Sequence, residues 1–255
     1  MENIKFAHIS PVCYMEKAEM FSGCNLVLAH LADVNDKYAN FYAKSKKYTI
    51  MDNGAFELGE SYDPSKLIEL GHKVNAQCIV LPDYPNQEWQ KTVDAAILHT
   101  PAIKAAGFDV MFVPQALKGD VEGYMKAWRW ALFSSNIDLV GLSILGAPNA
   151  YPEENRLITR YKILRELETN CHLKSFKKKI HMLGMLDTVH EIALCKQFEY
   201  AIKSWDSSAA VWAGLNDKRV SQLKSKFETP VDFDFPLQHE GTIRENIFYV
   251  QGLLS

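Results

Sequence analysis

Four polar residues stand at the ends of short apolar runs, where their side chains could carry chemistry. Asp52 ends the run YTIMD, Asp83 ends QCIVLPD, and Asp206 directly follows YAIKSW. Gln115 ends a fourth run, DVMFVPQ. The carboxyl ends of parallel strands meet at one face of a sheet or barrel. If these runs are parallel strands, the sequence predicts three carboxylates and one amide at a common site.

Two carboxylates and a recognition pair fit a displacement at a glycosidic carbon. One carboxylate can attack the carbon and form a covalent intermediate. The other can give a proton to the leaving group and take one from the entering group, as in retaining glycosidases. An aspartate and a glutamine suit the edge of a guanine-like base. The carboxylate accepts from the amine and the ring N–H, and an amide or a Gly-Leu backbone N–H donates to the carbonyl oxygen.

Each of these residues also has a purely structural interpretation. Asp52 could close a turn through its own side chain, Asp83 could cap a loop, and Asp206 could cap the helix that follows it. His8 and His30 fit core or loop positions. Three carboxylates could hold magnesium, but no phosphate-cradling loop accompanies them. No His-Asp-Glu spacing is typical of a metal site, so no metal is expected.

Eight short apolar runs predict the strands that must position these residues. Most do not alternate with polar residues, which is typical of strands buried on both faces of a parallel sheet. The runs are 5–10, 25–30, 48–52, 77–83, 109–115, 138–143, 179–184 and 200–205. Helix-like segments lie between most of them, which predicts a single (β/α)8 barrel over residues 1–255. A doubly wound sheet is the alternative, but no G-x-G-x-x-G follows any run.

The connecting segments carry helix start signals. Asp63 and Pro64 predict a helix over 63–74, with the aspartate as its cap. Pro152 predicts the first turn of a later helix, and Asp187 the cap of another. Asn53-Gly54 is typical of a hairpin, but between a strand and a helix it predicts a tight βα turn. Further helices are expected over 86–107, 120–135, 152–170, 187–198 and 242–254, whereas 31–47 and 206–240 are the least regular stretches.

Composition narrows the class of protein. The 255 residues are 47% hydrophobic and 23% charged, which is ordinary for a globular chain. No run approaches the ~18–20 apolar residues of a membrane span, and no secretory signal is visible, so a cytoplasmic location is expected. The five dispersed cysteines form no C-x-C or C-x-x-C, which disfavours a cysteine-rich zinc site. The net charge is −3, but basic islands at 156–165, 174–179 and 218–226 predict a basic face for phosphate contacts.

The order of six motifs resembles that of the tRNA-guanine transglycosylases and their DNA-acting relatives. The motifs are MDNGAF, LPDYP, VPQALKGD, VGLS, MLGMLDT and KSWDSS, and the resemblance covers roughly residues 48–210. It implies a (β/α)8 barrel that replaces guanine in a polynucleotide with a 7-deazaguanine.

The resemblance also implies a role for each matching residue. Asp206 falls at the position of the nucleophile, and Asp52 at that of the general acid/base. Phe56, in the same DNGAF segment, corresponds to the aromatic residue that stacks on the base. The resemblance implies further base contacts from Asp83, Gln115, the backbone N–H groups of Gly141 and Leu142, and the apolar wall residue Leu183.

Several departures from the tRNA enzymes shape the expected substrate. The sequence has no C-x-C-x-x-C zinc segment, and SAAVWAGLN (208–216) replaces the arginine-bearing P-T-R segment. Asn53 and Ala55 also differ from the family pattern beside the acid/base. A short, zinc-free chain is more similar to the virus-encoded DNA 7-deazaguanine transglycosylases, which insert bases such as 7-cyano-7-deazaguanine and protect viral DNA from restriction nucleases. The resemblance thus implies DNA as substrate, a free 7-deazaguanine base as co-substrate, no zinc or other cofactor, and the host cytoplasm as location.

Three other interpretations stay open at this point. The same exchange could act on tRNA. A barrel nucleosidase or hydrolase would instead release free base without any incoming base. A degenerate barrel could bind nucleic acid or a partner protein, although the intact set of carboxylates disfavours this. Trp128, Trp130 and Trp212 could stack on bases, but they fit core or helix-surface positions better.

Overall fold

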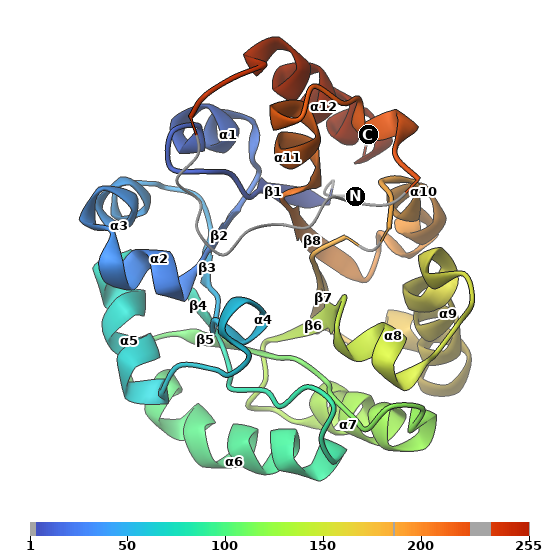
Figure 1. Cartoon of the computed structure of the whole chain (residues 1–255). Helices are drawn as coiled ribbons and strands as arrows, with labels where there is room; N and C mark the ends of the chain where they lie inside the picture. Colours follow the sequence, from blue (N-terminus) through green and yellow to red (C-terminus); the bar gives the residue numbers. More distant parts are fainter. Residues whose placement is uncertain (1–3, 186, 225–235, 255) are drawn as a thin grey trace.

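Eight parallel strands form a nearly closed barrel inside a ring of helices (Figure 1). The computed structural model describes residues 4–185, 187–224 and 236–254. The strand order is β1-β8-β7-β6-β5-β4-β3-β2, and Gly23 N–H donates to Phe6 O (2.8 Å) at the seam before β2. The strands are β1 (Lys5–His8), β2 (Asn25–Val27), β3 (Thr49–Met51), β4 (Cys78–Val80), β5 (Asp109–Phe112), β6 (Leu139–Ser143), β7 (Lys179–Leu183) and β8 (Ile202–Ser207). The predicted (β/α)8 barrel is confirmed, with a strand in each of the eight predicted runs or overlapping it.

Burial on both faces explains why the strands do not alternate in the sequence. Every residue of β3, β4 and β6 is buried, because one face lines the barrel interior and the other packs against helices. Gly141 in β6 shows how tightly the interior is filled. A Cβ atom there would lie 2.7 Å from Leu183 Cδ1 and 2.9 Å from Val113 Cγ2. Because glycine has no side chain, Leu183 and Val113 can occupy this space below the barrel mouth.

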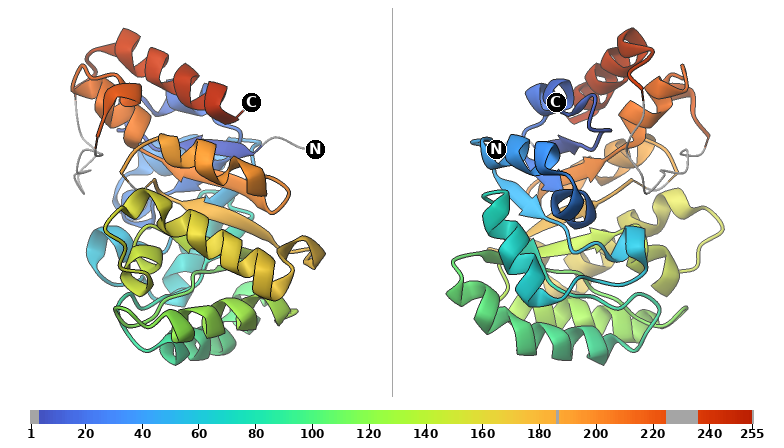
Figure 2. Two further views of the ribbon diagram at one scale, coloured as in Figure 1. Left: turned by 90° about the vertical axis from the view of Figure 1, so that its right-hand side faces the viewer. Right: turned by 60° about the vertical axis from the view of Figure 1, so that its left-hand side comes forward.

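Helices follow the strands along the chain and cover the outside of the barrel. Figure 2 shows α11 and α12 side by side, and Gly214 permits this contact, because a Cβ there would lie 2.5 Å from Ile243 Cα. The longer helices are α1 (Met15–Phe21), α3 (Asp36–Ala43), α5 (Pro64–Lys73), α6 (Trp89–Ala105), α7 (Val121–Phe133), α9 (Thr159–Cys171), α11 (Ala209–Leu215) and α12 (Glu240–Leu254). The shorter ones are α2 (Ala29–Val34), α4 (Ala55–Leu58), α8 (Gly146–Ala150) and α10 (His190–Cys195), with 3-10 turns η1 (Arg156–Ile158), η2 (Leu173–Ser175), η3 (Lys196–Phe198) and η4 (Val220–Gln222).

Hydrogen bonds at the helix starts confirm one predicted cap and correct another. Asp63 caps α5, since its Oδ1 accepts from Ser65 N–H (2.9 Å). Asp187 does not cap α10, because the neighbouring Thr188 Oγ1 accepts from His190 N–H (3.3 Å) instead. Aspartate and threonine are both favoured as helix caps, so residue type alone does not show which of two neighbouring residues caps the helix.

Two other local predictions were wrong. The helix expected from Pro152 begins only at Thr159, because the Asn155 side chain accepts from Leu157 N–H (3.1 Å) and starts the 3-10 turn η1. The stretch 31–47 is not irregular but contains most of α2 and all of α3. Within 206–240, α11 and η4 are formed, and residues 225–235 lie outside the described part of the chain.

In the ranges that the structure covers, no helix is both long enough and apolar enough to cross a bilayer.

Candidate active site

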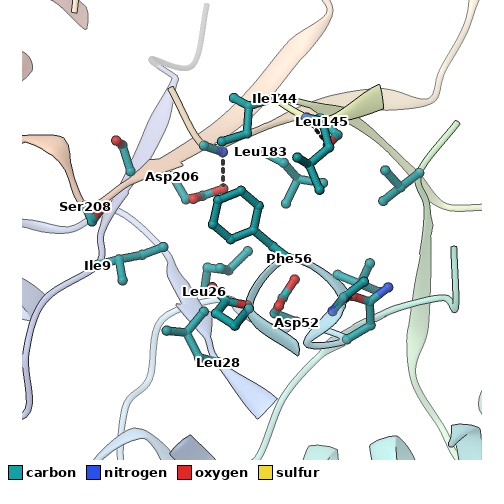
Figure 3. A pocket seen from close by; sticks show the side chains of 18 of the residues that line it. Ile9, Leu26, Leu28, Asp52, Phe56, Ile144, Leu145, Leu183, Asp206 and Ser208 are labelled. Atoms are coloured by element: carbon teal, nitrogen blue, oxygen red, sulfur yellow. Dashed lines mark hydrogen bonds between the residues drawn. The ribbon is translucent and has the colours of Figure 1, made fainter. Parts of the chain in front are cut away.

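A pocket at the carboxyl ends of the strands brings the three predicted carboxylates together (Figure 3). Asp52 directly follows β3, Asp83 lies beyond β4, and Asp206 belongs to β8. The cavity measures about 100 Å³. Its wall is mostly apolar, formed by Ile9, Leu26, Leu28, Val80, Val113, Ile144, Leu145, Leu183 and Met185. An apolar pocket with a few convergent polar groups is typical of a small-ligand site.

Asp206 is held in one orientation by two contacts to the same oxygen. Its Oδ1 accepts from Gly184 N–H (3.1 Å) and lies 2.9 Å from His181 Nε2. The His181 ring is fully buried, and its Nδ1 lies 2.7 Å from Ser204 Oγ. Residues two apart on a strand share a face, so Ser204 and Asp206 both point into the barrel. Strands β7 and β8 thus fix the carboxylate between them.

Asp52 lies in a tight turn that leads from β3 into α4. Gly54 takes a φ of 79°, in the left-handed region, and its N–H donates to Asp52 Oδ2 (3.0 Å). Asn53 does not share this conformation, so the pair forms a βα turn, as predicted, and not a hairpin. The Gly54 N–H places the carboxyl beside the pocket.

Burial raises the pKa of Asp52 to about 7. The Gly54 N–H favours the charged form and works against this, while the negative charges of Asp206 and Asp83 raise the pKa further. A carboxyl group that titrates near neutral pH can both give and take a proton under ordinary conditions. The site therefore contains one fixed carboxylate and one carboxyl suited to proton transfer.

Asp83 belongs to a buried polar cluster at the wall of the pocket. Its Oδ1 accepts from Asn53 Nδ2 (2.6 Å) and its Oδ2 from Gln115 Nε2 (2.5 Å). Burial raises the pKa of Asp83 to about 6, although both amide donors lower it. Gln115 is fully buried and does not line the pocket. Asp83 and Asn53 therefore face the pocket, and the amides of Asn53 and Gln115 orient the Asp83 carboxyl group.

Phe56 and Leu183, the residues predicted to flank a base, both line the pocket. The Phe56 side chain is 46% exposed, and its ring projects from α4 into the space beside Asp206 (Figure 3). Leu183 stands on the opposite wall at the end of β7. Between them an aromatic and a branched apolar surface are available to a flat ligand.

Gly141 and Leu142 do not line the pocket, although the resemblance implies base contacts from their backbone. Gly141 lies below the pocket floor against Leu183, and the Leu142 side chain is fully buried. The pocket is lined instead by the next three residues, 143–145. The strand β6 ends at Ser143, as its predicted run does, so the difference lies in the carry-over of the family motif and not in the strand boundary.

Sequence reasoning missed three residues that support the carboxylates: His181, Asn53 and Arg160. His181 had a usable signal, since it is a polar residue inside an apolar run and shares a face of β7 with Leu183. The Asn53 contact to Asp83 joins residues 30 apart, and nothing in the sequence indicates that pairing.

Arg160 ties the ends of β6 and β7 together from a fully buried position. Its Nε and Nη2 each donate to one oxygen of Glu191 (2.6 Å), which is buried as completely. Its Nη1 donates to the carbonyls of Leu142 (2.9 Å) and Leu183 (3.0 Å), and Nη2 also donates to Gly184 O (2.9 Å). All five guanidinium donors are thus satisfied. The clamp fixes the peptide whose N–H holds the β8 carboxylate.

Among the described residues, the basic islands do not gather into one face at the mouth. The lysines of 174–179 lie before or at the amino end of β7, at the opposite end of the barrel. In the island 156–165, Arg160 is buried, whereas Arg156 and Lys162 are exposed. The third island, 218–226, lies partly outside the described residues. On the described βα loops, the basic side chains are Lys118 and Arg156. Arg156 Nη1 lies 4.0 Å from Asp187 Oδ1. Other acidic side chains on these loops are Glu60, Glu88, Asp120, Glu153 and Glu154, and Glu57 lies on the short helix α4.

The remaining observations concern metal ligands, cysteines and similarity to known proteins. In the described ranges, no group of three or more His, Cys, Asp or Glu side chains is arranged to hold a metal ion. All five cysteines are free thiols. No protein-family model matches the chain, and no curated protein matches it. The resemblance to the guanine transglycosylases stays a prediction from motif order.

Proposed function

We propose that this protein is a transglycosylase that replaces guanine in DNA with a 7-deazaguanine derivative through a covalent aspartyl-sugar intermediate. One observation carries the proposal. A single pocket contains Asp206, held through one carboxylate oxygen, and Asp52, whose pKa lies near 7. This is the pairing that a double displacement at a sugar carbon needs. The motif order supports guanine as the leaving base and DNA as its carrier.

In the first half of the reaction the target nucleotide leaves the base stack and enters the pocket, as enzymes that act on a base require. Asp206 attacks C1′ of the deoxyribose, and the bond between C1′ and the guanine nitrogen breaks. The bonding electron pair goes to the base, and protonated Asp52 gives it a proton. The sugar is then esterified to Asp206, and the phosphate backbone is intact.

In the second half the 7-deazaguanine occupies the same slot. Asp52, now ionised, takes the proton from the ring nitrogen, and that nitrogen attacks C1′. The ester bond to Asp206 breaks, which restores its carboxylate. Asp52 ends protonated and ready for another cycle, so no net proton, electron or water is consumed.

The pocket wall supports a guanine-like base in both halves. Asp83 keeps lone pairs free beyond its bonds to Asn53 and Gln115, and it can accept from the ring N–H and the exocyclic amine. Phe56 and Leu183 provide surfaces above and below the ring. The 7-deazaguanines differ from one another in the substituent at the 7-position, and this substituent distinguishes one incoming base from another.

A nucleosidase that acts on single nucleosides is the second candidate, and the charge of the rim favours it. Acidic side chains predominate on the described βα loops, and they repel the phosphates of a polynucleotide. In this alternative, water activated by Asp52 replaces the incoming base and the product is free guanine. In the first proposal, the resemblance further supports viral DNA as the substrate and protection from restriction nucleases in the host cytoplasm as the result.

The test is base exchange with defined substrates. The protein is incubated with duplex DNA, single-stranded DNA, tRNA or deoxyguanosine, each with labelled 7-deazaguanine bases, and the nucleosides are analysed after digestion. We expect label in DNA, a loss of at least about 10⁴-fold in Asp206→Asn, and severe impairment in Asp52→Asn. Asp94→Asn, an exposed aspartate on α6, is the matched control with normal activity.

Three results would change the proposal. Label in tRNA alone would overturn DNA as the substrate. Free guanine released without any incoming base would favour the nucleosidase. Full turnover by Asp206→Asn would remove this residue as the nucleophile.

A further inference from the structure

We infer that His181 is the positioning residue for Asp206, and that it directs attack through the Oδ2 atom of that carboxylate. The inference rests on the proposed function, since it concerns the same covalent step. The observation behind it is the unequal use of the two carboxylate oxygens. Oδ1 accepts from Gly184 N–H and contacts His181 Nε2, whereas no donor among the described residues reaches Oδ2. Oδ2 is thus the oxygen left for a bond to C1′.

The contacts of the His181 ring indicate which of its nitrogens faces the carboxylate and which faces the hydroxyl. An ionised carboxylate offers only acceptors, so Nε2 must carry the proton that bonds to Asp206 Oδ1. In a neutral ring Nδ1 then accepts, and Ser204 Oγ–H donates to it (2.7 Å). The chain Ser204–His181–Asp206 therefore fixes one ring orientation and, for a neutral ring, selects the tautomer with the proton on Nε2. Because the ring is fully buried, water does not compete for either nitrogen.

A neutral donor suits both states of the nucleophile. When Oδ2 bonds to the sugar carbon, Asp206 loses its charge and Oδ1 becomes the carbonyl oxygen of the ester. The His181 Nε2–H and the Gly184 N–H can still donate to that oxygen. A charged imidazolium would be left buried without a counter-charge at this stage, which is costly. His181 therefore holds the carboxylate through the cycle and transfers no proton itself.

A buried histidine on a strand could also be simple core packing, and His8 on β1 shows what that looks like. It is buried beside β8, and neither of its ring nitrogens has a hydrogen-bond partner among the described residues. It packs against Phe6 with ring centroids 4.7 Å apart. His181 differs because both of its nitrogens are used, one of them on the proposed nucleophile. His8 is therefore the matched control.

The test compares four variants with the wild-type protein: His181→Leu, His181→Gln, His8→Leu and Asp206→Asn. Three quantities are measured: the first-turnover rate of the covalent enzyme–sugar adduct, the KM of the incoming base, and the melting temperature. We expect His181→Leu to form the adduct about 100-fold more slowly, because Asp206 loses its alignment. The KM of the base should stay unchanged, because His181 does not line the pocket. His181→Gln, whose amide N–H can replace Nε2–H, should recover at least about tenfold of the loss.

The outcomes separate this inference from the proposed function. Suppose that Asp206→Asn is inactive, so that the proposed function holds. Wild-type adduct rates in His181→Leu would then overturn the positioning role. Equal losses of rate in His181→Leu and His181→Gln, at similar melting temperatures, would overturn it as well. A similar loss in His8→Leu would show that any buried histidine next to β8 has the same effect, and would also overturn it. A wild-type protein with no more adduct than Asp206→Asn would overturn the proposed function, and this inference with it.

Discussion

At the residue scale, the pocket contains carboxyl groups in positions that disfavour their charged forms. Asp52 and Asp83 have pKa values raised to about 7 and about 6, in each case mainly by burial. Such placement lowers the stability of the folded protein at neutral pH, because the unfolded chain ionises these groups more easily. Strongly shifted carboxyl groups in a pocket are typical of functional sites. The shift at Asp52 has a direct consequence for stability.

We expect Asp52→Asn to raise the free energy of unfolding at pH 8 by about 1–3 kcal/mol. The raised pKa of Asp52 corresponds to a destabilisation of up to about 4 kcal/mol, and relaxation of the surrounding structure reduces this figure. The folded-state pKa lies above the ordinary value of 3.8, so the folded protein binds the proton more tightly than the unfolded chain. The wild-type protein therefore gains stability as the pH falls from about 8 toward 4, and the advantage of the variant disappears there. Urea unfolding between pH 4 and 8 measures this, with Asp94→Asn as the control. An asparagine variant less stable than the wild type at pH 8 would contradict it.

The residues at strand ends could be predicted, and their supporting contacts could not. Asp52, Asp83 and Asp206 were found because a parallel barrel places every carboxyl strand end at one mouth. The resemblance pointed to Gly141 and Leu142, whereas the pocket is lined by residues 143–145; the end of β6 itself was predicted at Ser143. Contacts between distant residues, such as His181 with Asp206, depend on strand register, which one sequence does not encode locally.

At the element scale, the Arg160–Glu191 pair joins α9 and α10 to the ends of β6 and β7. Both side chains have no exposed surface. A buried ion pair adds little net stability, but removal of one partner leaves the other charge uncompensated. The clamp also fixes Gly184, whose N–H holds the proposed nucleophile.

We expect Glu191→Gln to lower the free energy of unfolding by about 3–5 kcal/mol, because the Arg160 charge stays buried without its partner. Arg160→Met combined with Glu191→Met should recover part of this loss while base exchange stays impaired. Glu245→Gln is the control, since its pair with Arg219 is exposed and should change stability by less than about 0.5 kcal/mol. Chemical denaturation of the four proteins measures the differences. A loss below about 1 kcal/mol in Glu191→Gln would mean that the clamp is not a structural requirement.

The order of elements was predictable because eight apolar runs alternate with helix-like segments. The first and last residues of the helices were harder to predict. The start of α9 was misplaced since Pro152 and two glutamates look like a first helical turn, whereas Asn155 forms a separate 3-10 turn. The helices α2 and α3 were missed, because α2 has no side-chain cap and α3 is capped by Asn35 in a stretch without clear periodicity.

At the scale of the whole molecule, the charge distribution limits how a polynucleotide can bind. Islands of lysine and arginine in the sequence suggested one basic face, but among the described residues the fold separates them: Lys174 lies before the amino end of β7, Arg156 lies on a loop at the mouth, and Arg160 is buried. A sequence shows how many charged residues there are, but whether they lie on the same face of the molecule depends on the fold. If DNA is the substrate, the extruded nucleotide and a few phosphates must provide most of the affinity.

We therefore expect a shallow salt dependence of DNA binding, with Kd rising less than about tenfold between 50 and 200 mM salt. A protein gripping 6–10 phosphates would lose about 10³–10⁵ over this range. Lys118→Glu, on a loop at the mouth, should weaken binding, whereas Lys174→Glu, before the amino end of β7, should not. Fluorescence anisotropy with a labelled duplex measures both. A steep slope, or equal effects of the two variants, would place the DNA elsewhere on the surface.

The central claim is that Asp206 becomes covalently attached to the sugar, and one measurement tests it most directly. The protein is mixed with a labelled guanine-containing DNA strand and quenched with denaturant within the first turnover. The adduct is then separated on a denaturing gel and mapped by mass spectrometry. The prediction is a DNA adduct on Asp206 in the wild-type protein and in Asp94→Asn, and none in Asp206→Asn. An adduct on any other residue, or base exchange that proceeds with no adduct at all, would contradict the claim.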